Sequence, residues 1–263
     1  MTFDEITQRF WASLPGRMVT GIIEINIVDR ALAISSKAFV VLIPLSILTG
    51  AFVQRRSLGD TLVERFDLEG NGAEAARTLF ESPDVVRASI SFFGIAFLLF
   101  GAVSLARNVE RVYLDAWAME SAPGSVIRRL GWILSVVGFL AIAGPIRQLL
   151  DELGLDVKLA IVNLALGTLM WAWTPYLLLA QRVPIRELLP SGVLTAAATV
   201  ALGIASLVYV PTVMTTNADR YGLIGVAFAL VSWLFAYACA VIAAIVVGAV
   251  LAGRDPVSDE AGR

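Results

Sequence analysis

Charged side chains within long apolar stretches are the residues of this chain best placed to do chemistry. Lys37 is the only charge in the stretch 31–53, and Arg147 lies near the end of the stretch 130–150. Ionisable residues inside apolar spans are rare, and they often mark the pathway of an ion or a solute. Lys37 is therefore a candidate for a polar cavity or pathway, and Arg147 is a candidate for a gate or an anion contact.

Both charges also have a structural interpretation. Lys37 lies seven residues after Arg30, which is about 10 Å along a helix, and a lysine can extend its amine to the membrane interface from that depth. Arg147 can pair with Asp151, because residues four apart lie on one helical face. The sequence leaves both interpretations open.

Three further candidates lie in the stretch 159–181. Asn163 needs a hydrogen-bond partner in lipid, and it could either join two helices or contact a ligand. Pro175 removes a backbone donor and kinks a helix, and such breaks are tolerated at membrane depth where they are buried or line a cavity. Tyr176 follows directly, and it could line that cavity or belong to a belt of interfacial aromatic residues.

The composition excludes several kinds of site. Histidine is absent and Cys239 is the single cysteine, so metal sites built on histidine or cysteine, His-dependent triads and disulfides within the chain are excluded. The net charge of −2 gives no basic footprint for nucleic acid. We therefore predict no catalytic residues, no metal, no cofactor and no nucleic-acid partner, and we do not expect an enzyme.

Long apolar segments must position these candidates. Hydrophobic residues make up 58% of the 263 residues and charged residues 16%, with a mean hydropathy of +0.79. About 20 apolar residues cross a bilayer, and backbone groups in lipid must be satisfied internally, so each such segment is a helix. The sequence predicts an all-α polytopic membrane protein with the lipid bilayer as its partner. The six predicted spans are about 31–53, 88–106, 130–150, 159–181, 191–213 and 222–252.

Two non-spanning parts accompany this transmembrane domain of 31–253. Thr2 and Glu5 resemble a capping box, and the residues after them predict an amphipathic helix in the segment 1–30 that Pro15-Gly16 ends. This helix lies on the membrane interface or packs on the bundle. The first external loop has two helix-like stretches, 58–68 and 73–82.

Lysine and arginine predict the orientation. Arginines are concentrated in the N-terminal flank, in 107–129, in 182–190 and in the tail 254–263, whereas the opposite flanks hold few apart from the long loop 54–87. We therefore expect both termini in the cytoplasm.

The last span carries small residues at every fourth position. Such a stripe suits a close crossing with a neighbouring helix or with a second copy of the chain, which would make a homo-oligomer. The predicted packing residues are Ser232, Ala236, Ala240, Ala244 and Gly248.

Four stretches, taken in order and spacing, resemble the YihY/BrkB family of bacterial inner-membrane proteins. They are Arg182–Gly192 (RVPIRELLPSG), Tyr221-Gly222 with Gly225 and Trp233-Leu234, Arg30–Ala33 (RALA) with Pro44, and Ala106-Arg107-Asn108 with Tyr113. Many relatives end the last span with Gly-Ala-Glu, whereas here Gly248-Ala249 is followed by Val250. A role for that acidic residue therefore does not carry over.

The resemblance implies a cytoplasmic-membrane protein for which a transport role is often proposed. The family's former label, ribonuclease BN, implies metal-dependent RNA hydrolysis, which needs clustered His, Asp or Glu ligands. This chain has no histidine, and its carboxylates lie mainly in flanks and loops, so we do not expect that activity. We predict a transporter or exporter of a solute or ion. The alternative is a non-transporting assembly, envelope-integrity or regulatory protein, and the sequence indicates no particular substrate.

Overall fold

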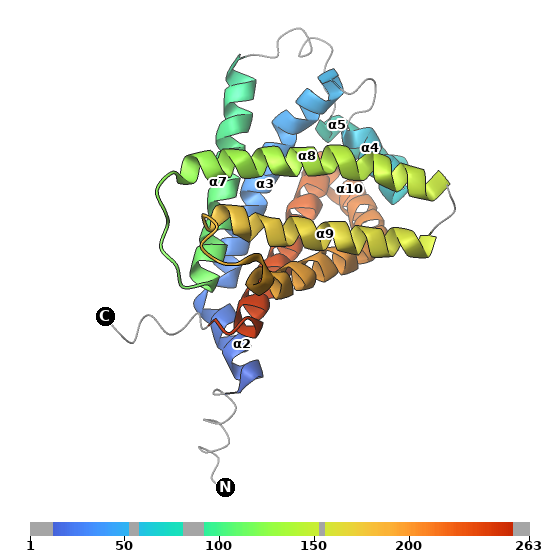
Figure 1. Ribbon diagram of the computed structural model, residues 1–263. Helices are drawn as coiled ribbons and strands as arrows, with labels where there is room; N and C mark the ends of the chain where they lie inside the picture. The colour runs from blue at the N-terminus through green and yellow to red at the C-terminus, as the bar shows by residue number, and fades with distance from the viewer. Residues whose placement is uncertain (1–12, 53–57, 81–91, 153–155, 255–263) are drawn as a thin grey trace. The chain divides into compact units, whose positions relative to one another are not determined.

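The computed structural model describes residues 13–52, 58–80, 92–152 and 156–254, and their regular elements are α-helices. The predicted all-α fold is confirmed for these residues, and so is a pair of short helices in the first loop. Eight helices fall within the described ranges (Figure 1). They are α2 (Leu14–Glu24), α3 (Ile27–Phe52), α4 (Leu58–Phe66), α5 (Gly70–Phe80), α7 (Phe92–Ala116), α8 (Ser125–Glu152), α9 (Asp156–Leu178) and α10 (Ile185–Leu251).

The helices belong to two compact units. Unit 1 takes the described residues of Met1–Ala31, Ala106–Val200 and Cys239–Arg263, and unit 2 takes those of Leu32–Leu105 and Ala201–Ala238. Helices α3, α7 and α10 each contribute residues to both units. Within unit 1, α8 and α9 lie side by side, and within unit 2, α4 packs against α5 (Figure 1).

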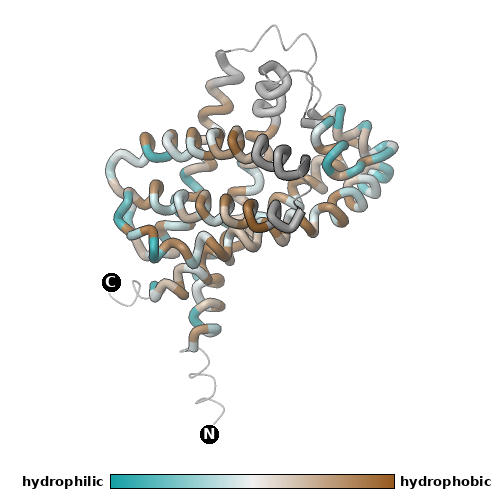
Figure 2. The backbone as a smooth tube through the Cα atoms, turned by 45° about the vertical axis from the view of Figure 1, so that its right-hand side comes forward, coloured by the Kyte–Doolittle hydropathy of each residue, from teal (hydrophilic) through white to brown (hydrophobic). Residues whose placement is uncertain are grey.

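Two helices are long and apolar enough to cross a membrane, namely α8 over Ser125–Ala143 and α10. In α8 the apolar side chains are largely uncovered, and Ile127, Leu134, Leu140 and Ile142 are 62–76% exposed. So many exposed large apolar side chains on one helix mark an interaction surface. Hydrophobic colours run along the long helices, whereas hydrophilic residues gather on α4 and α5 (Figure 2).

Helix α10 reverses direction at Gly222. This residue has φ 59° and ψ −142°, a conformation that is essentially restricted to glycine. In unit 2, a Cβ atom on Gly225 would lie 2.2 Å from the carbonyl oxygen of Asn217. Farther from the turn, the rings of Tyr209 and Trp233 stack with centroids 5.5 Å apart. The two arms of α10 therefore run antiparallel, as a helical hairpin.

The arms of this hairpin also meet in unit 1. A Cβ atom on Gly248 would lie 2.3 Å from the Cα atom of Ser191. The first arm continues as helix through 214–221, which the sequence pattern left outside the predicted spans. The reason is packing, because Val210, Met214 and Ala218 recur four residues apart and all are buried in unit 2.

Helix α5 packs on the hairpin within the core of unit 2. That core consists of Leu68, Ala73, Ala76, Val210, Met214, Ala218, Val226, Ala229 and Leu230. At the start of α5, Asn71 donates a side-chain hydrogen bond of 2.9 Å to Asp219 near the end of the first arm. Close approach to Thr215 requires Gly72, on which a Cβ atom would lie 3.0 Å from the threonine hydroxyl. The helix begins at Gly70, three residues before the predicted start.

The structure corrects the expected effect of Pro15-Gly16. The predicted capping box at Thr2 and Glu5 lies outside the described residues, but a helix begins at Leu14, so the Pro-Gly pair lies at the start of a helix. Ser13 is its N-cap and accepts a hydrogen bond from the backbone of Gly16 at 3.4 Å. Serine at the cap followed by proline in the first turn is a helix start signal.

Candidate functional site

One face of α7 is completely buried in unit 1 and contains a carboxylate. Ala106, Glu110 and Tyr113, with Trp117 just after the helix, recur three or four residues apart, and each is at most 1% exposed. Three of these residues form an ordinary apolar stripe. A buried glutamate requires a charge partner or hydrogen bonds, because transferring a lone charge out of water is costly.

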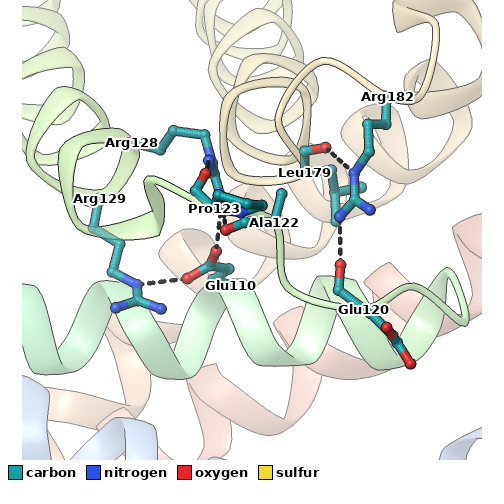
Figure 3. Close-up of polar contacts among 8 residues, drawn as sticks. All are labelled: Glu110, Glu120, Ala122, Pro123, Arg128, Arg129, Leu179 and Arg182. Atoms are coloured by element: carbon teal, nitrogen blue, oxygen red, sulfur yellow. Dashed lines mark hydrogen bonds and ion pairs between the residues drawn. The ribbon is translucent and has the colours of Figure 1, made fainter.

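Two arginines of α8 supply that partner. The Nε of Arg129 donates to Oε2 of Glu110 at 2.5 Å, and Nη2 of Arg128 lies 3.7 Å from Oε1 (Figure 3). The arginine side chains are only 10% and 15% exposed. We call Glu110, Arg128 and Arg129 the Glu110 cluster. Because one carboxylate holds two consecutive arginines, the cluster fixes the position of α7 against the start of α8.

Arg128 of the cluster and Arg182 hold the connection between α7 and α8, residues 117–124. Arg128 donates to the backbone carbonyls of Ala122 and Pro123. Arg182, which follows α9, donates to the carbonyl of Glu120 (Figure 3). The connection is thus held at three carbonyl groups, by one arginine of α8 and one that follows α9.

Polar contacts link all four segments that the sequence predicts to be basic flanks. The four flanks are the N-terminal segment, 107–129, 182–190 and the C-terminal segment, and all four lie in unit 1. Each contact joins two of these flanks, as the bond from Arg182 to Glu120 does. The links are an ion pair between Arg30 and Asp115, a hydrogen bond of 3.3 Å from Arg17 to the carbonyl of Arg254, and an ion pair of 2.9 Å between Arg254 and Glu187.

Burial changes the acidity of two side chains in this region. Burial raises the pKa of the Asp115 carboxyl, and the nearby positive charges of Arg30 and Arg111 oppose that rise. Burial also raises the pKa of the Tyr113 hydroxyl. The hydroxyl of Tyr113 and the indole nitrogen of Trp117 have no hydrogen-bond partner among the described residues. Tyr113 is therefore neutral, and it contributes to the buried face of α7 by packing.

The predicted candidates Pro175 and Tyr176 lie where α9 packs against α8. Pro175 is buried and Tyr176 is half-buried, with its ring 5.6 Å from that of Trp173. The neighbouring polar atoms bond to α8, since Trp132 donates to Thr174 at 3.1 Å. The residue directly before Pro175 is therefore engaged in a contact between α8 and α9.

The other three candidates are placed less completely. Arg147 lies in α8 and Asn163 in α9, both in unit 1, and their side chains lie outside the described part of the structure. Lys37 lies in α3, is half-buried and belongs to unit 2. The pathway roles of all five residues stay predictions.

The small-residue stripe is covered unevenly. Gly248 is buried against Ser191, Ala240 and Ala244 are half-buried, and Ser232 and Ala236 are exposed. The fully buried face of this arm consists mainly of larger residues, Val241, Ile242, Ile245, Val246 and Val250. Packing of the stripe against a second copy of the chain stays a prediction.

Unit 2 contains an apolar pocket of about 240 Å³. None of the five predicted pathway residues lines it. The lining residues are Leu62, Arg65 and Phe66 of α4, Tyr209, Val210, Val213 and Met214 of the first arm, and Ala229, Leu230 and Trp233 of the second arm.

Sequence reasoning missed the Glu110 cluster and this pocket. One signal for the cluster was available, namely a glutamate at an apolar position of the α7 pattern. The pocket brings together segments about 150 residues apart, so no local pattern indicates it. Within the described ranges, no group of three or more His, Cys, Asp or Glu side chains is arranged to hold a metal ion.

No protein-family model, curated protein or solved structure matches this chain. The resemblance to the YihY/BrkB family rests on the four sequence stretches quoted above.

Proposed function

We propose that this chain is a multi-pass protein of the bacterial cytoplasmic membrane, of the YihY/BrkB type, that transports or exports a solute. The many exposed apolar side chains of α8 support a location in lipid, because a soluble protein rarely leaves so large an apolar surface uncovered. The apolar sequence of α3, α7, α9 and both arms of α10 supports six spans in total.

The contacts among the four basic flanks support the predicted orientation. The hydrocarbon core of a bilayer is about 30 Å thick, so segments that hydrogen-bond to one another lie on the same side of it. Four flanks that share one side, and that carry most of the arginines, fit a cytoplasmic face. The bond between Asn71 and Asp219 likewise fits a common external side for the first loop and the turn of α10.

The apolar pocket of unit 2 is the observation that supports transport. A carrier needs a chamber between helices in which its cargo can leave water, and this pocket lies between α4 and the two arms of α10. We propose that it is the binding chamber.

Flux into liposomes tests this role. Purified protein is reconstituted, and uptake is measured for a panel of inorganic ions, small organic anions and single-chain amphiphiles. We expect flux of one of these classes above that of empty liposomes. Ala229→Phe, which fills the pocket, should lower that flux at least tenfold. Ala205→Phe, at an exposed position of the same helix, should leave it within twofold. Equal flux through both variants, or no flux above empty liposomes, would contradict the proposal.

The alternative function is a non-transporting assembly, envelope-integrity or regulatory protein. The Glu110 cluster and the connection 117–124 favour it, because the buried arginine contacts hold the exposed connection in one conformation. A chain that carries no solute in the flux assay would have this surface as its functional part.

A further inference from the structure

We infer that the pocket of unit 2 binds an anionic amphiphile with one apolar chain, the head group lying at Arg65 and the chain between the arms of α10. This assignment of a ligand class rests on the proposed role of the pocket as a binding chamber. It is argued from the walls of the pocket, its charge and its size.

The walls are part of the core of unit 2. Val210 and Met214 of the first arm face Ala229 and Leu230 of the second, and all four are buried members of the same apolar cluster. The stacked rings of Tyr209 and Trp233 close another part of the wall. A ligand in this pocket must therefore place an apolar group among these side chains, because a polar group would lose its hydrogen bonds to water there.

Arg65 is the only charged residue among the described residues that line the pocket. Leu62, Arg65 and Phe66 lie three and four residues apart, and hence on one face of α4, and all three line the pocket. Arg65 is exposed, so its guanidinium remains at the water-facing rim. A guanidinium at the rim of an apolar pocket recognises a carboxylate or a phosphate.

Arg65 and Arg77, the arginines of α4 and α5, differ in whether they already have an acidic partner. Arg77 of α5 donates from Nε to the carboxylate of Asp60 at 3.2 Å. Arg65 forms no ion pair or hydrogen bond with any residue in the described part of the chain. The guanidinium that lines the pocket is thus the one free to bind an anion.

The size of the pocket limits the apolar part of the ligand to one chain. At about 240 Å³, the pocket is smaller than the roughly 300–1,000 Å³ of drug-sized sites. It holds about eight groups of the size of a water molecule, at about 30 Å³ each. A single chain with about eight of its carbon atoms in the pocket is therefore the ligand class that we test, and a decyl chain leaves its remaining carbons at the rim beside the head group.

Photolabelling with decyl phosphate that carries a diazirine near the chain end tests the inference. The full chain is placed in nanodiscs of zwitterionic lipid, irradiated and digested, and labelled peptides are identified by mass spectrometry. We expect label in peptides that contain Leu62–Phe66, Tyr209–Met214 or Ala229–Trp233. Unlabelled decyl phosphate should compete at least fivefold better than decyltrimethylammonium, because only the phosphate can pair with Arg65.

Two variants test separately whether binding depends on the charge of Arg65 and on the volume of the pocket. Arg65→Gln should weaken competition by decyl phosphate about fivefold, the effect of one exposed charge pair, whereas the matched Arg77→Gln should change it less than twofold. Ala229→Phe should remove the label, and Ala205→Phe should keep it. Circular dichroism and gel filtration of each variant verify that it is folded.

Three results would overturn the inference: equal competition by the cationic and anionic amphiphiles, unchanged competition in Arg65→Gln, or label confined to exposed apolar residues such as those of α8, which indicates general lipid contact. The flux assay tests the transport role independently of the ligand class. A labelled pocket without flux would remove transport and leave the ligand class standing, whereas flux without label in the pocket would remove the ligand class.

Discussion

Glu110→Gln is expected to lower the free energy of unfolding by about 3–5 kcal/mol, the cost of breaking a buried ion pair from one side. Glutamine keeps the shape of the side chain but not its charge. The buried Arg129 and the largely buried Arg128 would then be left without a counter-charge, and α7 would lose its fixed position against α8. Denaturant unfolding of the protein in detergent micelles, followed by circular dichroism, measures the loss.

Two controls separate this effect from a general sensitivity to lost charge. Glu187→Gln breaks the more exposed pair with Arg254 and should cost at most about 1 kcal/mol. Replacing Glu110 with leucine and Arg129 with methionine together should recover part of the loss, because well-packed apolar residues can substitute for a buried pair. Equal destabilisation by Glu110→Gln and Glu187→Gln would show that the cluster does not bind the two helices together.

Gly248→Ala is expected to lower the free energy of unfolding by about 1–3 kcal/mol. The added Cβ would lie 2.3 Å from the Cα atom of Ser191 and 2.7 Å from its backbone nitrogen. Backbone atoms cannot move aside as the end of a flexible side chain can, so the two arms of α10 must separate and lose packing. The same unfolding experiment measures the effect.

Gly203→Ala is the matched control, since it lies in the same helix and a Cβ atom there would meet nothing within 4 Å. Alanine favours a helix over glycine by about 1 kcal/mol, so this variant should be neutral or more stable. If the two alanine variants had the same stability, the close contact between the arms of α10 would be refuted.

The helices were predictable because their cause is local. Apolar segments of this length form helices in lipid. The short pair α4 and α5 also follows from local pattern, although α5 begins at Gly70 and includes Gly70-Asn71-Gly72. Helix ends were less predictable. Helix α7 continues to Ala116, ten residues past the predicted end of its span, because the buried face of Glu110 and Tyr113 extends it beyond the apolar run.

The candidate site was less predictable because its contacts are tertiary. Arginines at 128 and 129 are evident in the sequence only as positive charges near a span, and nothing local pairs them with Glu110. The role of Arg65 in the pocket depends on residues from both arms of α10. Lys37, by contrast, was singled out by a local signal, a charge in an apolar run. Such a signal identifies the residue but not the side chains that surround it in the fold.

The measurement that tests the membrane arrangement most directly is labelling of single cysteines from outside the cell. The native thiol is first removed by Cys239→Ala. Ser121→Cys is then placed in the exposed connection between α7 and α8, and Glu74→Cys in the exposed face of α5. A membrane-impermeant maleimide should label Glu74→Cys in spheroplasts and should label Ser121→Cys only after the membrane is permeabilised. Labelling of Ser121→Cys in intact spheroplasts, or equal labelling of both, would contradict the account.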